Sequence, residues 1–297
     1  MPGGFTTTED LTLIHSSKTL MHAVALTSLV AMPAFAQQQL EPAILVVGAS
    51  YEQGGGPFND ALQAPLGGIA VNAGSYLSLG NALARSRALD GFIINEAQGG
   101  ATTFDRLACN PGPDCGPAAW QGLDTQLTKA IARVTLRNPA NPAQILGYNA
   151  DYVVIGGMND CLHADAFGVP TTQTQKCSVA ELEAVADRLI AAGSRALSLG
   201  IKPVYYAMPA YDRMDLPLAA SLFGLPWMLS SEVEYSQWRD TIWNHLKAGL
   251  PGALFVADAW NGFSHIGDGL HPSPSSAEKA AQRIAVAILI DRAKKRQ

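Results

Sequence analysis

The sequence lacks the marks of several protein classes. Its 28 glycines and 18 prolines among 297 residues form no repeat and no low-complexity tract, which excludes a collagen-like or fully disordered chain. Charged residues make up only 15% of the chain, the net charge is −5, and no basic stripe is present, so nucleic acid is a poor candidate partner. The length allows one sizeable core and is compatible with one or two domains, and we predict one because no internal repeat or clear linker divides the chain.

Motifs of the common metal- and cofactor-dependent enzymes are also absent. The chain has no His-Glu-x-x-His zinc motif, no Walker phosphate loop and no dinucleotide-binding fingerprint. We therefore predict neither a metal nor a cofactor. Residues 48–52 read Gly-Ala-Ser-Tyr-Glu and so lack the Gly-x-Ser-x-Gly elbow, which disfavours an enzyme of the α/β-hydrolase type.

Cysteine is scarce, and its spacing indicates disulfides. Cys109 and Cys115 bracket the turn-forming sequence Asn-Pro-Gly-Pro-Asp, and Cys161 and Cys177 bracket a loop-like stretch of 15 residues. The Cys-x-x-Cys spacing that a zinc site would need is missing. Four cysteines allow three pairings, and the simplest closes one loop with each pair, joining Cys109 to Cys115 and Cys161 to Cys177. Such bonds are typical of an oxidising compartment.

The N-terminal segment differs from the rest of the chain. Lys18 precedes an apolar run that ends in Ala34-Phe35-Ala36. A cationic flank, a short apolar stretch and small residues at a cleavage position are typical of a secretory signal. The run is too short and interrupted for a membrane span, which needs about 20 apolar residues. We predict a signal peptide over residues 1–36, one domain over residues 37–297, and a secreted or periplasmic protein without an integral span after cleavage; a misassigned start and a retained anchor are the alternatives.

Five short apolar runs, each ended by turn residues, predict buried strands, and segments with helical spacing lie between them. One of these helices opens with a capping box, Ser178 with Glu181. Because strands and helices alternate, the sequence predicts an α/β fold, a three-layer α/β/α sandwich around a central parallel sheet of about five strands. The predicted strands are Ala43–Val47, Gly91–Glu96, Tyr152–Ile155, Pro203–Met208 and Ala253–Ala257, and the predicted helices cover residues 75–89, 118–136, 179–199, 231–248 and 275–292.

Chemistry is expected just after these strands, because open parallel sheets bind ligands beyond the carboxyl ends of their strands. Four short motifs lie there. Each motif alone is weak, since a serine, a glycine pair or an Asn-Asp pair at such a place usually only forms a turn. Together they supply every part of an acyl-transfer site. The motifs are Gly48-Ala49-Ser50, Gly99-Gly100-Ala101-Thr102-Thr103, Gly157-Met158-Asn159-Asp160 and Asp268-Gly269-Leu270-His271-Pro272.

The residue types in these motifs fit nucleophilic catalysis. A serine hydroxyl is a poor nucleophile at neutral pH and needs an adjacent base, which histidine can supply. We predict Ser50 as the nucleophile and His271 as the base, with Asp268 holding the imidazole in one tautomer. The oxyanion of the tetrahedral intermediate needs donors already in place, and the backbone N–H groups of Ser50 and Gly100 and the side-chain amide of Asn159 can supply them.

Two other histidines are weaker candidates for the base. His265 lies six residues before His271, but the residue three positions ahead of it, Gly262, is not acidic. His163 lies inside the loop between two cysteines and is expected at the surface or the rim of the site. His271 is therefore the preferred base.

The four motifs resemble the four signature blocks of the SGNH hydrolase superfamily, also called the GDSL-like lipases and esterases. Ser50, Gly100, Asn159 and His271 match the residues that give the superfamily its name, and Asp268 matches its third triad member. The resemblance spans nearly the whole predicted mature chain and implies a flavodoxin-like sheet. It also implies a serine hydrolase that acts on ester bonds.

The first block departs from the superfamily pattern. The superfamily has Gly-Asp-Ser where this chain has Gly48-Ala49-Ser50. The missing Asp is not a triad member, so the mechanism does not require it, but what it stabilises around the first loop is left open. The stretch from Tyr51 to Gly74 is long and Gly-rich, and we interpret it as an inserted loop at the mouth of the site.

The substrate class stays open, because the superfamily covers lipids, short acyl esters, acetylated sugars and thioesters. The apolar segment Met214–Met228 is either the wall of an acyl pocket or a short core-packing helix. The leading hypothesis is an esterase acting on acyl or acetyl esters of a small molecule, lipid or glycan. The alternatives are a carbohydrate O-acetyl esterase and a catalytically silent glycan-binding protein of the same fold, the latter suggested by Ala49.

Overall fold

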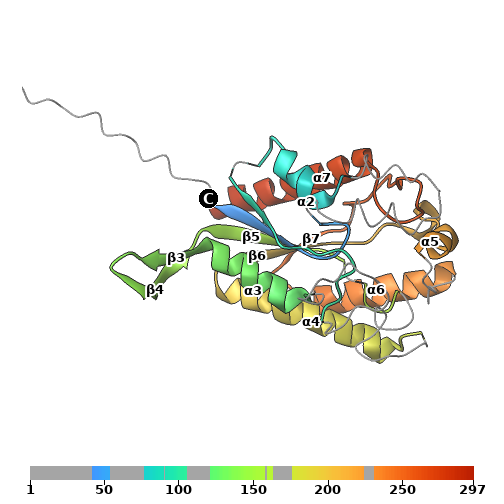
Figure 1. Cartoon of the computed structure of the whole chain (residues 1–297), viewed down its shortest axis with the longest axis horizontal. Coiled ribbons are helices and arrows are strands. Elements are labelled where there is room, and N and C mark those ends of the chain that lie inside the picture. Colours follow the sequence, from blue (N-terminus) through green and yellow to red (C-terminus); the bar gives the residue numbers. More distant parts are fainter. Residues whose placement is uncertain are drawn as a thin grey trace, which may run out of the picture. The chain divides into compact units, whose positions relative to one another are not determined.

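The computed structural model describes residues 42–53, 77–89, 91–105, 121–157, 159–162, 176–223 and 231–297. The predicted signal peptide, most of the predicted inserted loop, Cys109, Cys115 and His163 lie outside these residues. Within them, five parallel strands form one sheet in the order β2-β1-β5-β6-β7 (Figure 1). The strands are β1 (Ala43–Val47), β2 (Ile93–Asn95), β5 (Ala150–Ile155), β6 (Lys202–Tyr206) and β7 (Leu254–Val256).

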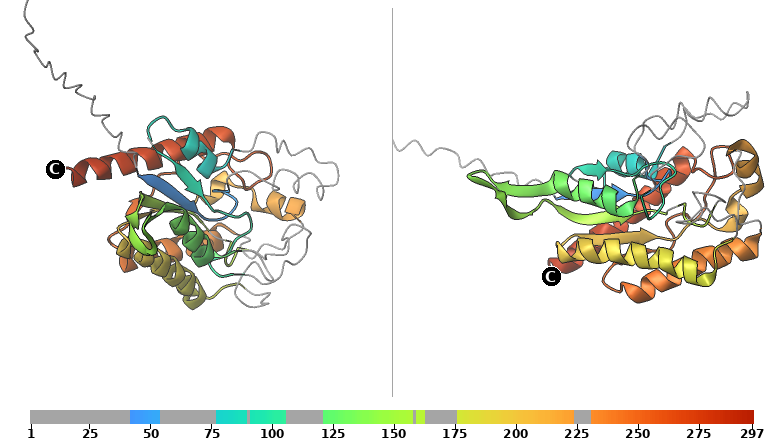
Figure 2. Two further views of the ribbon diagram at one scale, coloured as in Figure 1. Left: turned by 60° about the vertical axis from the view of Figure 1, so that its left-hand side comes forward. Right: turned by 60° about the horizontal axis from the view of Figure 1, so that its bottom comes forward.

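Helices cover both faces of this sheet (Figure 2). On one face α2 packs against α7, and on the other α4 packs against both α3 and α6. The predicted three-layer α/β/α sandwich is therefore confirmed. The helices are α2 (Leu79–Arg85), α3 (Leu123–Val134), α4 (Val179–Ser198), α6 (Glu232–Gly249) and α7 (Pro274–Lys295).

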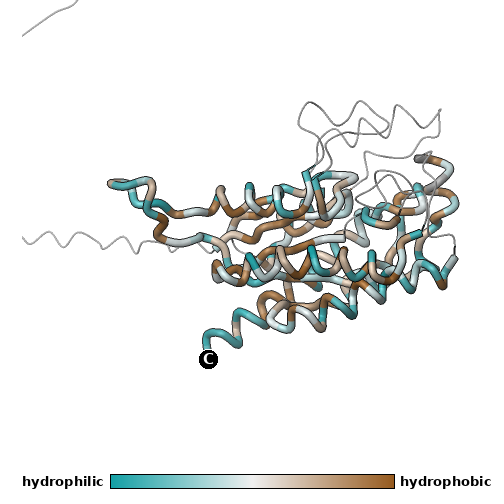
Figure 3. The backbone as a smooth tube through the Cα atoms, turned by 90° about the horizontal axis from the view of Figure 1, so that it is seen from below, coloured by the Kyte–Doolittle hydropathy of each residue, from teal (hydrophilic) through white to brown (hydrophobic). Residues whose placement is uncertain are grey.

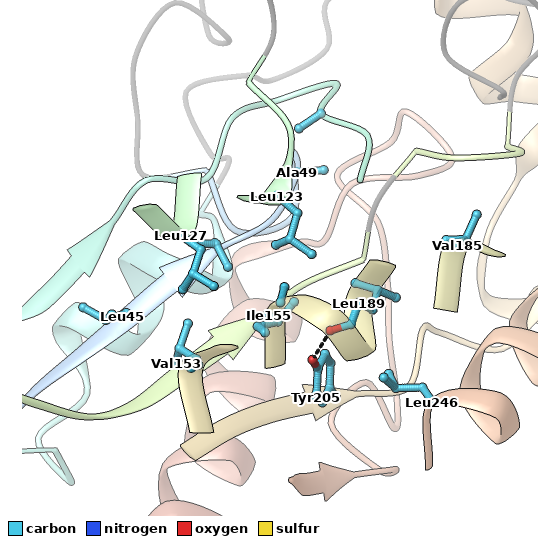
Figure 4. Close-up of a cluster of buried hydrophobic side chains, with 14 of the residues drawn as sticks. Leu45, Ala49, Leu123, Leu127, Val153, Ile155, Val185, Leu189, Tyr205 and Leu246 are labelled. Atoms are coloured by element: carbon cyan, nitrogen blue, oxygen red, sulfur yellow. Dashed lines mark hydrogen bonds between the residues drawn. The ribbon is translucent and has the colours of Figure 1, made fainter. Parts of the chain in front are cut away.

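The strands form the core because successive side chains point to opposite helical layers. Leu45 and Val47 of β1 join a buried cluster with α3, α4 and α6 (Figure 4), whereas Ile44 and Val46 join a second cluster with α2 and α7. Each such buried side chain stabilises the fold by about 1.5–3 kcal/mol. Figure 3 shows hydrophobic residues along the inner segments and a hydrophilic C-terminal end of α7. The packed core fixes where each strand ends.

The order in which strands are added to the sheet reverses at β1. β2 pairs with one edge of β1 and β5 with the other, so that Val46 lies opposite both Asn95 and Val154. Such a switch opens a crevice at the carboxyl ends of the two central strands, and open α/β sheets bind their ligands there. Ser50 and Asn159 follow these two strands directly.

The sequence does not predict the antiparallel hairpin formed by β3 (Thr135–Asn138) and β4 (Asn141–Tyr148). The helix predicted over residues 118–136 begins later and ends earlier, as α3, and its expected last residues belong to β3. Most hairpin residues are exposed or half-buried. Because the hairpin buries no regular face, it lacks the alternation of apolar and polar residues by which a strand is recognised.

Serine residues cap the starts of two helices, and one of these caps, Ser178 with Glu181, was predicted from the sequence. Ser178 caps α4 in a capping box, in which the Glu181 carboxylate accepts the Ser178 N–H at 2.7 Å. Ser273 caps α7, and Pro274 occupies its first turn, where a missing N–H costs no hydrogen bond. This cap fixes the chain immediately after His271.

The apolar segment Met214–Met228, predicted as either a pocket wall or a core-packing helix, is described up to residue 223. It contains α5 (Leu216–Phe223), whose Leu216, Ala219 and Leu222 are buried. This agrees with the core-packing interpretation for the described part. No helix among the described residues is long and apolar enough to cross a membrane.

Candidate active site

Backbone hydrogen bonds join the first three motifs at the carboxyl ends of the strands. The Gln98 N–H donates to the Gly48 carbonyl at 3.1 Å, and the Asn159 N–H donates to the Ala101 carbonyl at 3.0 Å. The side chains of this region are largely withdrawn from water, since Ser50 is 8% exposed and Asn159 is 9% exposed. Electrostatic interactions are stronger in such surroundings than in bulk water.

His271 and Asp268 form a hydrogen-bonded pair on the loop before α7. Nδ1 of His271 lies 2.5 Å from Oδ2 of Asp268, and Oδ1 accepts the backbone N–H groups of Leu270 and His271 at 2.9 and 2.8 Å. Burial alone raises the pKa of Asp268, but the charge and hydrogen bond of His271 and the two backbone donors outweigh it, so the pKa is lowered overall. An ionised Asp268 favours Nδ1 as the protonated ring nitrogen, which makes Nε2 the nitrogen that can accept a proton.

Glycines and His265 shape the same loop. Gly267 and Gly269 have φ angles of +100° and +81°, which glycine adopts without steric cost. A Cβ at Gly269 would lie 2.1 Å from the carbonyl oxygen of Asp215. The N–H groups of both glycines donate to Nδ1 of His265 at 3.1 and 3.2 Å. His265 is therefore engaged in the structure of the loop.

Tyr51 links the Ser50 turn to the His271 loop. Its hydroxyl donates to the Leu270 carbonyl at 2.6 Å, and its ring centre lies 6.2 Å from that of His271. The ring is buried and packs edge-on against Trp260. Tyr51, which follows Ser50, is thus hydrogen-bonded to Leu270, which precedes His271.

We expect Tyr51→Phe to lower kcat/KM for p-nitrophenyl acetate by about five- to tenfold. The change removes one partly buried hydrogen bond, worth about 1 kcal/mol, between the Ser50 turn and the His271 loop. Tyr148→Phe removes the same hydroxyl in the hairpin and is the control, for which kcat/KM should not change. Equal losses in both variants would contradict the role of Tyr51.

Asn159 donates two hydrogen bonds to one carbonyl group. Its backbone N–H and its Nδ2 both donate to the Ala101 oxygen at 3.0 Å. A primary amide has two N–H donors, so this contact leaves the second for a ligand. Gly100, in the motif next to it, has a φ of +75°. This left-handed backbone conformation is one that glycine adopts without steric cost, which explains a glycine at this position.

Asp160 ties the second and third motifs together. Its buried carboxylate accepts the N–H and hydroxyl of Thr103 at 2.7 and 2.6 Å, and Arg188 donates to it at 3.2 Å. Burial raises the pKa of Asp160, and the contacts with Thr103 and Arg188 oppose that rise. Nε1 of Trp238 donates to the Asp160 carbonyl at 3.1 Å. The turn that carries Asn159 is therefore anchored from several elements.

Asp160→Ala should lower the free energy of unfolding by about 2–3 kcal/mol, because it leaves the buried Thr103 N–H without its acceptor and removes the carboxylate that pairs with Arg188. Urea denaturation measures this difference. Asp212→Ala, at an exposed carboxylate, is the control and should change stability by less than about 0.5 kcal/mol. If both variants unfolded alike, Asp160 would not anchor the turn.

A disulfide closes the chain beside the third motif. Cys161 and Cys177 are bonded, with Cα atoms 5.6 Å apart, which confirms the second predicted pair. Cys161 directly follows Asp160, and Cys177 directly precedes the cap of α4. The predicted pair of Cys109 and Cys115 lies outside the described residues and stays a prediction.

A fully buried carboxyl group lies beside the Ser50 turn. Oε2 of Glu52 accepts the Ala49 N–H at 2.9 Å, whereas Oε1 has no hydrogen-bond partner within the described part of the chain. Two glycines make room for this carboxyl group: a Cβ at Gly48 would lie 2.3 Å from Oε2, and one at Gly156 would lie 2.0 Å from the carboxyl carbon. Burial raises the pKa of Glu52 well above its ordinary value, despite opposing backbone hydrogen bonds, so the protonated form is favoured.

Tyr51, Glu52 and Asp160 were not predicted as site residues, although each lies within two residues of one. Asp160 lies inside a recognised motif, and its acidic side chain after an apolar strand was a usable signal. Glu52 is acidic within a Gly-rich stretch, which by itself is more typical of an exposed loop. Nothing in the sequence marks Tyr51.

An apolar cavity of about 50 Å³ lies between α4 and α6. Gly157 is the described residue of the third motif that lines it, and neither Ser50, Asn159 nor His271 does. Its position is therefore distinct from the predicted reaction centre, and we assign it no substrate.

No protein-family model and no curated protein matches this chain. Its structure is similar to that of an acetylxylan esterase from Geobacillus stearothermophilus, at 14% identity and a TM-score of 0.44 over 83% of this chain and 94% of that one. It is also similar to a GDSL-like lipase from Bacteroides thetaiotaomicron, at 11% identity and a TM-score of 0.39 over 85% of this chain and 89% of that one. A Bacillus subtilis protein is 15% identical, with a TM-score of 0.44, and the match covers 85% of this chain but only 57% of that one.

Two of these proteins bear the esterase and GDSL names that the motifs led us to expect. At such identities and TM-scores the likeness carries no conclusion about the reaction. The reaction has to be inferred from the residues of the site.

Proposed function

We propose that this protein is a serine esterase of the SGNH hydrolase superfamily that hydrolyses carboxylic esters through an acyl-Ser50 intermediate. One observation carries the proposal. His271 and Asp268 form a buried hydrogen-bonded pair, and the loop that carries them is hydrogen-bonded to the Ser50 turn, from the Tyr51 hydroxyl to the Leu270 carbonyl. A serine beside an oriented imidazole is the arrangement that nucleophilic acyl transfer needs.

In the proposed reaction, Nε2 of His271 removes the proton from the Ser50 hydroxyl as that oxygen attacks the ester carbonyl carbon. The imidazolium then gives the proton to the leaving alcohol, and the acyl group stays on Ser50. Water, deprotonated by the same imidazole, attacks the acyl carbon; the imidazolium then returns the proton to the Ser50 oxygen as its bond to that carbon breaks, which releases the acid and restores the enzyme. Asp268 keeps Nδ1 protonated throughout and stabilises the imidazolium.

The oxyanion of each tetrahedral intermediate needs preorganised donors. We assign this role to the backbone N–H groups of Ser50 and Gly100 and to Nδ2 of Asn159. The bond from Asn159 to Ala101 supports the assignment, because it fixes the amide before substrate binds. Loss of one such donor raises the barrier by about 2.7–4 kcal/mol in a well-studied protease.

The proposed substrate is an acyl or acetyl ester of a small molecule, a lipid or a glycan. Secretion, or export to a periplasm, is part of the proposal. It is supported by the N-terminal sequence pattern and by the disulfide between Cys161 and Cys177, since such bonds persist in oxidising compartments.

A hydrolysis panel tests the proposed function. The purified protein is incubated with p-nitrophenyl esters from acetate to octanoate and with acetylated xylan, and acid release is measured at neutral pH. We expect turnover of at least one ester without added metal, and its chain-length preference separates a carbohydrate deacetylase from a lipid esterase. Glycan binding without hydrolysis of any ester would contradict the proposal and favour the silent binding protein.

A further inference from the structure

We infer that Glu52 is a positioning residue for Ser50, whose buried carboxyl group holds the turn of the nucleophile in a chain that has Ala49 where the superfamily has Asp. This inference rests on the proposed role of Ser50. The contact that carries it is the hydrogen bond from the Ala49 N–H to Oε2 of Glu52. Ser50 lies between these two residues in the chain.

The turn is closed from both directions. Besides the Ala49 N–H to Glu52 carboxyl contact, the backbone N–H groups of Glu52 and Gln53 donate to the Ala49 carbonyl at 3.2 and 3.1 Å. This reciprocal pattern resembles a capping box, in which a side chain and a backbone group satisfy each other across one turn. The direction of the Ser50 hydroxyl and of its N–H group depends on this turn.

Neighbouring strands and helices hold the same turn in place. Nδ2 of Asn95 donates to the Glu52 carbonyl at 2.6 Å, and the Leu79 N–H donates to the Tyr51 carbonyl at 2.7 Å. Gly48 donates its N–H to the buried side chain of Gln126 at 2.8 Å. The carboxyl group therefore lies within a rigid frame, and a change in it is transmitted to Ser50.

A purely stabilising role fits Glu52 poorly. Burying a carboxyl group with one oxygen unpartnered costs stability relative to an apolar side chain of the same size. The raised pKa favours a neutral acid, for which glutamine is the closest substitute because it keeps one carbonyl acceptor. Methionine has a similar length and volume but offers the Ala49 N–H no oxygen.

The test compares Glu52→Gln with Glu52→Met in the full chain, using p-nitrophenyl acetate kinetics, the rate of labelling by a fluorophosphonate probe, and Tm. We expect Glu52→Gln to keep kcat within about threefold of the wild type. Glu52→Met should lose about ten- to a hundredfold in kcat, with KM within about twofold, because misplacing a reacting group by about 1 Å can cost a hundredfold. Its Tm should change little, because removing a buried carboxyl group with an unpartnered oxygen offsets the loss of the acceptor for the Ala49 N–H. A merely structural residue would lose kcat and Tm together.

Gly156→Ala perturbs the same carboxyl group without changing Glu52 itself. Because its Cβ would lie 2.0 Å from the Glu52 carboxyl carbon, it should displace the carboxyl group and lower kcat as Glu52→Met does. Gly252→Ala is the matched control, since its Cβ would meet only Leu197 at 3.4 Å. Wild-type kcat in Gly156→Ala would contradict the inference.

The outcomes separate this inference from the proposed function. Wild-type kcat in Glu52→Met, or an equal loss in Glu52→Gln, overturns the role of Glu52 while Ser50→Ala remains inactive. If Glu52→Met does not fold, Glu52→Asp decides: its carboxyl group falls one methylene short of the Ala49 N–H, so a loss of kcat supports the inference and an unchanged kcat overturns it. A wild type that neither turns over esters nor reacts with the probe overturns both.

Discussion

Ser50→Ala is expected to lower kcat for ester hydrolysis by about a million-fold while leaving the fold intact. Loss of the triad serine in subtilisin has an effect of about this size, because the remaining triad residues have no nucleophile to activate. The substitution removes one oxygen from a buried turn. Initial rates with the best ester of the panel and the Tm of the variant measure the two expectations.

Ser194→Ala is the control for this result, because Ser194 lies exposed on α4. Its kcat should equal that of the wild type. If Ser50→Ala kept more than about a hundredth of the wild-type kcat, the covalent mechanism would be wrong. The site would then have to act through a bound water molecule.

Asp268→Asn is expected to lower kcat by about ten thousand-fold. The same exchange has this effect in a serine protease, because an amide presented to Nδ1 favours the wrong imidazole tautomer. Here the carboxylate lies 2.5 Å from Nδ1 and accepts two backbone N–H groups, so the amide would also leave those donors poorly paired. Steady-state kinetics of the variant measure the loss.

The lowered pKa of Asp268 adds a pH dependence with a defined sign. A carboxyl group whose pKa is lower in the folded than in the unfolded chain stabilises the fold above its unfolded value, about pH 3.9, and this contribution is lost as the pH falls through the folded value. The wild type should therefore lose stability in acid more steeply than Asp268→Asn. Asp258→Asn, at an exposed position, should follow the wild type in both kcat and acid stability. Wild-type kcat in Asp268→Asn would contradict the proposed pairing.

The fold was predictable from the sequence because it depends on continuous apolar runs. β1 matches its predicted range, Ala43–Val47, and the other four predicted strands are present with shifted ends. The three central strands, β1, β5 and β6, are buried on both faces, so an apolar composition is enough to identify them, whereas the edge strands β2 and β7 are partly exposed. The hairpin of β3 and β4 was missed for the opposite reason, since its residues face water and carry no burial pattern.

The residues of the site were predictable from the sequence only where they lie in short motifs. Asp268 and His271 are three residues apart, so their pairing follows from local geometry. The contacts of Tyr51 with Leu270 and of Asp160 with Arg188 join residues that are distant in sequence. No spacing rule connects such residues, because the packing of the sheet brings them together. Their roles could be seen only once the strand order was known.

The burial of Glu52 also could not be predicted from the sequence. An acidic residue in a Gly-rich segment is normally solvated, and only the spaces beside Gly48 and Gly156 reveal that this one is buried. The two glycines are 108 residues apart in the chain. Both glycines lie beside the Glu52 carboxyl group because β1 and β5 are neighbours in the sheet.

The most direct test of the proposed mechanism is labelling by a fluorophosphonate probe, with the modified residue located by mass spectrometry. An activated serine beside His271 and Asp268 should take up one label per chain, at Ser50, and the label should be absent from Ser50→Ala and strongly slowed in Asp268→Asn. Labelling at another residue, or undiminished labelling of Ser50→Ala, would contradict the assignment of Ser50 as the nucleophile.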